Sequence, residues 1–286
     1  MNGFLILDKP AEITSFSAVR HVRRCLSEKK VGHSGTLDPM ATGVLTVAVG
    51  RATAFLELLP DHDKSYESVF RLGLTTDTLD ITGTILSRCD DIPDEAAVRS
   101  ALDAFRGEIT QLPPMYSAVK VNGQRLYELA RQGREAARQP RQATVCALDC
   151  ERLSEREYAL RLSCSSGTYV RSIIDDLGRA LSCGAVMTYL RRTRANGFAL
   201  SDAVRLDELS PDTPLLPVER AMETYPAVYV TEKQAVRFSN GGSLDRERLR
   251  FAGEDGLVRV YGPKNAFLGV GTMGGDALTV KKLYLV

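Results

Sequence analysis

Asp38 stands out among the residues of this chain that could do chemistry. It is preceded by Gly32 and Gly35 and followed by Pro39 and Gly43. The proline ring biases Asp38 towards an extended backbone, and the glycines permit unusual backbone angles or the close approach of a ligand. A carboxylate held stiffly on such a loop is a candidate reactive group, although an ordinary Asp-Pro turn is an equal interpretation of these residues alone. A phosphate-binding loop is excluded, because its lysine is absent.

The segment Gly32-His-Ser-Gly-Thr-Leu-Asp-Pro-Met-Ala-Thr-Gly43 resembles the catalytic motif of the bacterial TruB family, the tRNA pseudouridine-55 synthases. This chain has Ser34 and Met40 where that family usually has Thr and Leu, and both changes are conservative. The resemblance implies that Asp38 is the catalytic aspartate and that His33 lies near the displaced base.

Two further segments resemble motifs of the same family. Residues 64–73 alternate like a strand and match a Lys-x-Tyr…Leu-Gly motif, which implies that Tyr66 stacks on the target base and is a candidate proton acceptor. Residues 167–171 match Gly-Thr-Tyr-x-Arg, which implies that Arg171 pairs with the catalytic aspartate and that Tyr169 lines the uridine pocket. Leu190 matches another pocket position. Without the resemblance, Tyr66 is an ordinary half-buried strand tyrosine and Arg171 a surface arginine that the helix dipole disfavours.

The chemistry that the resemblance implies needs one carboxylate. Pseudouridine formation breaks the N-glycosidic bond of uridine, turns the base and rejoins it through C5, without oxidation and without consuming water, whereas glycoside hydrolases need two carboxylates. Asp38 either attacks C1′ as a nucleophile or assists loss of the base through a glycal. Tyr66 or a water then removes a proton. The base must be extruded first, and no metal or other cofactor is required.

Residues 120–141 form the most basic stretch of the chain. In the family this region is a mobile thumb, here about residues 116–145, which closes over RNA. Tyr127 lies among the arginines of this stretch, and the stretch resembles the family's thumb. Both observations favour contact with phosphates over a solvated arginine-rich helix. The candidate RNA-contacting cations are Lys120, Arg125, Arg131, Arg134 and Arg138. Lys9, in a Lys-Pro segment that the family also has, is either a further contact or a solvated turn lysine.

The remaining pattern predicts an α/β (α+β) fold with a mixed, mostly antiparallel sheet. Helices are expected to begin at Thr14-Ser15 and at Pro93-Asp94, with another over residues 52–59. Prolines gather at residues 211–217, and short strands with glycine turns follow, which predicts a small β-barrel. The resemblance implies a pseudouridine synthase domain over residues 1–212 and a PUA-like RNA-binding domain over residues 213–286. A purely stabilising barrel is the alternative.

Composition narrows the classes of function. The net charge is only +1, so any basic face must be local. Six cysteines without Cys-x-x-Cys spacing and only three histidines argue against a zinc site and a Ser-His-Asp relay. No signal peptide or membrane-spanning apolar run is evident, so we expect a cytoplasmic protein.

The sequence therefore predicts an isomerase that converts uridine 55 in the T-arm loop of tRNA to pseudouridine. We expect a monomer that needs no cofactor, metal, membrane or guide RNA. A non-catalytic tRNA-binding or folding protein on the same scaffold is the first alternative, and a guide-RNA-dependent relative is the second. Asp38, Tyr66 and Arg171 together favour the enzyme.

Overall fold

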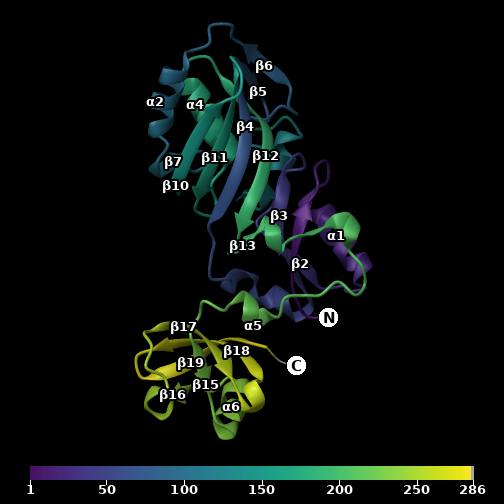
Figure 1. Cartoon of the computed structure of the whole chain (residues 1–286), viewed down its shortest axis with the longest axis vertical. Coiled ribbons are helices and arrows are strands. Elements are labelled where there is room, and N and C mark those ends of the chain that lie inside the picture. The colour runs from purple at the N-terminus through teal and green to yellow at the C-terminus, as the bar shows by residue number, and fades with distance from the viewer. Residues whose placement is uncertain (285–286) are drawn as a thin grey trace.

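A ten-stranded mixed sheet forms the centre of the computed structural model, which describes residues 1–284 (Figure 1). Its main path runs β14-β1-β3-β12-β4-β11-β10-β7, with β2 paired to β3 and β13 to β12. The pairs β1–β14 and β3–β12 are parallel and the others antiparallel, which confirms the mixed, mostly antiparallel sheet. The strands are β1 (Gly3–Lys9), β2 (Val31–Ser34), β3 (Thr42–Val49), β4 (Lys64–Leu72), β7 (Gly107–Gln111), β10 (Arg141–Arg152), β11 (Glu157–Cys164), β12 (Ala185–Ala195), β13 (Phe198–Ala199) and β14 (Val204–Arg205).

Helices cover this sheet, and their starts follow the predicted caps. Thr14 caps α1 (Ser15–Cys25) by accepting a hydrogen bond from the Ser17 backbone at 3.0 Å, and Asp94 caps α2 (Glu95–Asp103) in the same way. The apolar faces of α2 and α4 (Val170–Ala180) pack in one core with β4, β11 and β12, while α1 packs against β1 and β3. None of the described helices is both long and apolar enough to cross a membrane.

Two sequence-based expectations need refinement. The helix expected over residues 52–59 is a 3-10 helix, η1 (Gly50–Leu58). The basic segment is not one long helix: it contains the hairpin β8 (Lys120–Val121) and β9 (Gln124–Arg125), then the short α3 (Leu126–Ala130), and continues without regular structure to β10. A second small hairpin, β5 (Leu74–Thr76) and β6 (Ile85–Arg88), follows β4.

The C-terminal part is a separate five-stranded sheet in the order β15-β17-β18-β19-β16 (Figure 1). Its end strands do not pair with each other within residues 1–284, so the expected barrel is a half-barrel, which α6 (Glu232–Ser239) covers with Phe238. The strands are β15 (Ala227–Tyr229), β16 (Leu244–Asp245), β17 (Gly256–Tyr261), β18 (Phe267–Gly274) and β19 (Ala277–Leu283).

The half-barrel packs against the larger sheet. Phe267 and Val270 of β18 share a core with Phe55 of η1 and with Met222, next to the short α5 (Val218–Ala221). Leu216 exchanges two backbone hydrogen bonds of 2.8 Å with Phe4, so the chain is still attached to the first sheet beyond residue 212. The domain boundary at residues 212–213 stays a prediction.

The loop that carries Asp38 joins β2 to β3 and lies against β12. At Gly43 the parallel pairing of β3 and β12 brings the Arg192 carbonyl oxygen within 2.1 Å of where a β-carbon would stand, and Gly43 has φ +101°. Only glycine fits there. This close approach fixes the C-terminal end of the loop.

Candidate active site

An ion pair joins the two residues that the sequence motifs singled out. Arg171 Nη2 lies 2.9 Å from Asp38 Oδ2. The Arg171 side chain is only 5% exposed, whereas that of Asp38 is 32% exposed. The arginine is therefore fixed inside the protein, while the carboxylate remains accessible from solvent.

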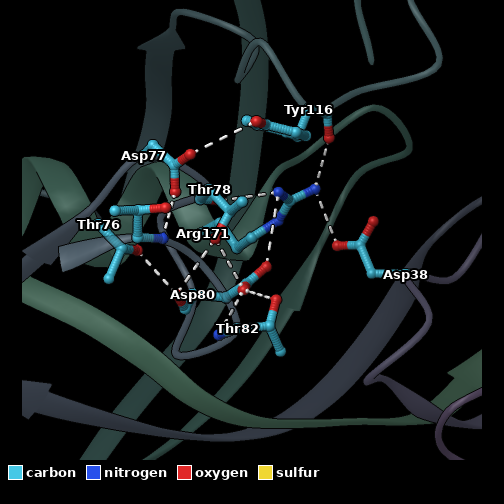
Figure 2. Close-up of polar contacts among 9 residues, drawn as sticks. Asp38, Thr76, Asp77, Thr78, Asp80, Thr82, Tyr116 and Arg171 are labelled. Carbon is cyan, nitrogen blue, oxygen red and sulfur yellow. Dashed lines mark hydrogen bonds and ion pairs between the residues drawn. The ribbon is translucent and has the colours of Figure 1, made fainter. Parts of the chain in front are cut away.

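Arg171 is held by groups from three parts of the chain (Figure 2). It lies in the first turn of α4, where a cation is ordinarily unfavourable. Nη1 donates to the Thr78 carbonyl at 2.9 Å, and Nη2 donates to the Tyr116 carbonyl at 2.9 Å. Asp80 Oδ2 lies 3.8 Å from Nη1, so carboxylates on two sides offset the position in the helix. The planar guanidinium can make all these contacts at once.

Asp80 is a candidate that sequence reasoning left without a role. It is 5% exposed, and its Oδ1 accepts hydrogen bonds from Thr78 Oγ1 at 2.9 Å and from the backbone and hydroxyl of Thr82 at 3.0 and 2.5 Å (Figure 2). Three threonine hydroxyls thus donate hydrogen bonds to Asp80: that of Thr76 to its backbone carbonyl, and those of Thr78 and Thr82 to its carboxylate. An aspartate within a run of alternating threonines was the available signal, but spacing alone does not reveal its partner.

Burial and charge act in opposite directions on Asp38. Burial raises the pKa of its carboxyl above the ordinary range, and the adjacent Arg171 guanidinium lowers the pKa, while Asp80 adds to the increase. Lys9 lowers it slightly. Arg171 is thus the main influence that opposes the effect of burial and favours the ionised form of this carboxylate.

A cavity of about 230 Å³ opens beside this ion pair. A cavity of about 150 Å³ already accepts benzene, so one nucleobase ring fits here in size. The expected pocket residues Tyr66, Tyr169 and Leu190 all line it, together with Asp38 and Arg171. Sequence elements far apart in the chain thus supply the wall: the loop before β3, β4, the start of α4 and β12.

Tyr66 lies on β4 and is only 7% exposed. Its cross-strand neighbours are Leu162 on β11 and Arg192 on β12. Burial raises the pKa of its phenol, and Arg192 is the main opposing influence. The tyrosine therefore presents an aromatic ring and one hydroxyl to the cavity.

Ser117 is a second residue that sequence reasoning missed. It is 5% exposed, it lines the cavity, and its hydroxyl has no hydrogen-bond partner among the described residues. Buried hydroxyls are usually bonded, so this one is available to a bound base. Nothing in the local pattern Met-Tyr-Ser-Ala distinguishes it from a surface serine.

His33 does not border this cavity. It lies on β2 opposite Val47, half-buried, and its Nδ1 has no partner in the part of the chain that the structure describes. Burial lowers the pKa of its imidazole, and Arg192 adds to this. Its predicted place next to a displaced base stays a prediction.

Lys9 is not the surface residue that both sequence interpretations assumed. It is completely buried, and its ammonium group donates to the carbonyls of Pro10, Ile13 and Pro39 at 2.7, 2.8 and 3.3 Å. The carbonyl of Pro39 belongs to the Asp38 loop. Three backbone acceptors thus occupy the donors that a phosphate would need, so in this structure Lys9 fixes the loop instead of contacting RNA.

Four arginines of the predicted thumb, residues 116–145, contact uncharged groups. Arg125 and Arg131 lie over the Tyr127 ring at 5.9 and 5.6 Å, and the other two guanidinium groups donate to the Gln132 side chain and the Pro113 carbonyl. Some exposed arginines elsewhere are paired with acids, as in Arg99–Glu95 and Arg205–Asp207, whereas Arg20 lies over the Phe16 ring. Within residues 1–284 none of the four thumb guanidinium groups forms an ion pair, and the segment has more cations than acids, so it carries net positive charge. The cations are Lys120, Arg125, Arg131, Arg134 and Arg138; all are exposed except the last, which is half-buried.

Comparisons with known proteins agree over the whole chain. Residues 23–170 match the N-terminal domain of TruB family pseudouridylate synthases, residues 171–223 match the tRNA pseudouridylate synthase B C-terminal domain, and residues 226–283 match the C-terminal model of pseudouridine synthase II TruB. A tRNA pseudouridine synthase B of Clostridium kluyveri is 39% identical over 100% of both chains. One of Burkholderia mallei is 42% identical over 99% of this chain and 97% of its own.

Solved structures show the same fold. An archaeal box H/ACA sRNP Nop10-Cbf5 complex matches with a TM-score of 0.72 at 26% identity, over 99% of this chain and 86% of the matched one. An H/ACA RNP bound to a substrate RNA containing 2′-deoxyuridine matches with a TM-score of 0.73 at 24% identity, over 99% and 85%. With the motifs, the full-length relatives and the fold in agreement, this chain belongs to the TruB family of pseudouridylate synthases and is an isomerase.

Proposed function

We propose that this chain converts uridine 55 in the T-arm loop of tRNA to pseudouridine, with Asp38 as the catalytic carboxylate. The observation that carries this proposal is the Asp38–Arg171 ion pair of 2.9 Å at the edge of a base-sized cavity. The names of the full-length relatives support tRNA as the substrate.

The target uridine is extruded from the loop and enters the cavity, since its reacting atoms are out of reach while the base is stacked. The Tyr66 and Tyr169 rings offer apolar faces to the base. Asp38 then attacks C1′ as the N1–C1′ bond breaks, or assists that cleavage through a glycal. Arg171 keeps the carboxylate ionised and aimed.

The freed uracil turns within the cavity and forms a bond from C5 to C1′. Asp38 is released unchanged, and the C5 proton leaves to Tyr66 or to a water. Every atom of the substrate is retained in the product, apart from this proton, which is replaced at N1 from solvent. The walls of the cavity keep the free base beside its sugar.

The thumb supplies the electrostatic part of binding. Its guanidinium groups have neutral partners, so they can neutralise RNA phosphates and release counterions. We propose that it closes over the T arm and that the enzyme acts as a monomer without a guide RNA.

Tritium release from a tRNA transcript labelled at uridine C5 tests the reaction. Wild type is expected to release one label per tRNA without any added guide, and to release none from a transcript with cytidine at position 55. Asp38→Asn should bind the transcript but slow release by about 10⁴-fold or more, as loss of a nucleophile does. Asp149→Asn, an exposed acid on β10, is the matched control and should retain full activity.

Other outcomes assign other functions. If wild type and Asp38→Asn both bind the transcript and neither releases label, the chain is a tRNA-binding protein. Release that requires an added guide RNA would indicate a guide-RNA-dependent enzyme. Equal release by both proteins would remove Asp38 from the reaction.

A further inference from the structure

Arg192 is a completely buried arginine directly opposite Tyr66. It is among the largest fully buried side chains, and the register of β12 and β4 pairs it with Tyr66. Residues directly opposite each other in an antiparallel pair have β-carbons about 4.5–5.5 Å apart on the same face of the sheet. The two side chains therefore meet on the face that carries the cavity.

Two donors of Arg192 hold the ends of the Asp38 loop. Nε donates to the Val44 carbonyl at 2.7 Å, and Nη2 donates to the Gly35 carbonyl at 3.0 Å. Gly35 precedes Asp38, and Val44 lies near the start of β3, the strand after the loop. One guanidinium thus bridges both ends of the loop from the opposite strand.

The third nitrogen, Nη1, is buried and has no hydrogen-bond partner within residues 1–284. A β-carbon placed on Gly35 would lie 3.4 Å from Nη1, and Gly35 lines the cavity. Nη1 therefore lies directly behind Gly35, which lines the cavity, while Arg192 itself is not among the lining residues. A buried charged group with an unpaired donor is costly, so Nη1 is available to an acceptor that comes within reach.

The charged groups around Tyr66 act in different directions on its phenol. Asp38 from the loop and Cys164 from β11 raise the pKa, as does burial, whereas Arg192 from β12 lowers it. Lys64, two residues earlier on the same strand, also lines the cavity. Among the elements packed against Tyr66, β12 supplies the cation that favours the phenolate.

We propose that Arg192 is a positioning residue for Tyr66: its Nη1, which has no partner in the described part of the chain, donates to the Tyr66 oxygen when the base is bound, so that this oxygen accepts the uracil C5 proton. This rests on the proposed function. In the step concerned, the C–H bond at C5 breaks, its electrons restore the uracil ring, and the proton moves to the Tyr66 oxygen. Arg192 keeps its own protons and anchors the Asp38 loop with its other two donors.

A double-mutant cycle measured by single-turnover tritium release tests this role. The proteins are wild type, Arg192→Gln, Tyr66→Phe and the double variant, with Arg192→Lys to restore the charge. Arg191→Gln is the matched control, because Arg191 is paired with Asp8 at 2.7 Å and does not line the cavity. Each rate is measured across a range of pH.

We expect Arg192→Gln to slow release by about 100-fold, in the range of lost acid–base assistance, and to displace the rise of rate with pH to higher pH. Arg192→Lys should recover part of both effects. In the Tyr66→Phe background, Arg192→Gln should cost much less than in wild type, because the group it acts through is gone.

Independent effects that multiply in the double variant, with an unchanged pH profile, would overturn the proposal and leave Arg192 a structural residue. A Tyr66→Phe variant as fast as wild type would overturn it as well. If Arg192→Gln fails to fold, the same cycle with Arg192→Lys decides between these outcomes. A wild type that releases no label refutes the proposed function itself, which keeps the two failures distinct.

Discussion

Arg171 Nη2 lies 2.9 Å from both the Asp38 carboxylate and the Tyr116 carbonyl. One nitrogen thus joins the Asp38 loop to the segment that begins the thumb. Any movement of residue 116 when RNA binds is therefore felt at the proposed nucleophile. This contact connects the start of the proposed thumb to the carboxylate that we propose as the nucleophile.

Arg171→Lys is expected to lower the rate of tritium release by about 100-fold, because lysine keeps the charge but cannot bond Asp38, Thr78 and Tyr116 at once. Affinity for tRNA should change little. Arg179→Lys, at the exposed end of the same helix, is the control. An unchanged rate in Arg171→Lys would show that charge alone suffices.

The acid limb of activity should lie above the pH at which an ordinary aspartate ionises, because burial raises the pKa of Asp38 and it must be ionised to react. Activity is then lost as pH falls through that raised pKa. Asp80→Asn removes a charge that raises the Asp38 pKa, so its acid limb should move to lower pH, while the plateau rate falls as Arg171 loses a partner.

Asp77→Asn is the matched control for this pH profile. Asp77 lies in the same turn, but its bonds go to the Thr84 backbone and the Tyr116 hydroxyl. Its acid limb should coincide with that of wild type. If the acid limb of Asp80→Asn lies at the same pH as that of wild type, the electrostatic link between Asp80 and Asp38 is disproved.

Lys9 should make stability depend on pH in the alkaline range. Burial lowers the pKa of its amine from 10.5 to about 8, so between these values the unfolded chain binds the proton and the folded chain does not. The free energy of unfolding then rises with pH over this window. Relative to Lys9→Met, wild type should gain about 2–3 kcal/mol between pH 8 and 10.5, by about 1.4 kcal/mol per pKa unit.

Urea unfolding of both proteins at the two ends of this window measures the difference, and other titrating groups cancel because both proteins carry them. If the difference in unfolding free energy between the two proteins does not change with pH, folding does not lower the pKa of Lys9.

Neutralising Arg131, Arg134 and Arg138 together to Gln should weaken tRNA binding and flatten its dependence on salt. Each lost phosphate contact reduces the slope of log K against log salt by about 0.7–0.9. The same change at Arg205, Arg220 and Arg248, which are paired with nearby acids, should leave the slope nearly unchanged. An unaltered slope in the thumb variant would remove these arginines from the RNA interface.

Local chemistry made much of this protein predictable from its sequence. The motif around Asp38 is glycine-rich and long, so it identifies the family, and caps at Thr14 and Asp94 mark the helix starts because a side-chain oxygen satisfies a nearby backbone donor. Alternation along residues 64–73 indicated the strand that carries Tyr66. All of these signals lie within a few residues of what they describe.

Only the tertiary structure decided which distant residues share the site. Asp80 reads as a turn acid and Lys9 as a surface lysine, yet one faces Arg171 and the other is fully buried. Arg192 meets Tyr66 because of the register between β12 and β4, and a register is set by the packing of the whole sheet. Burial and cross-strand contacts depend on where the rest of the chain lies, and no local pattern encodes them.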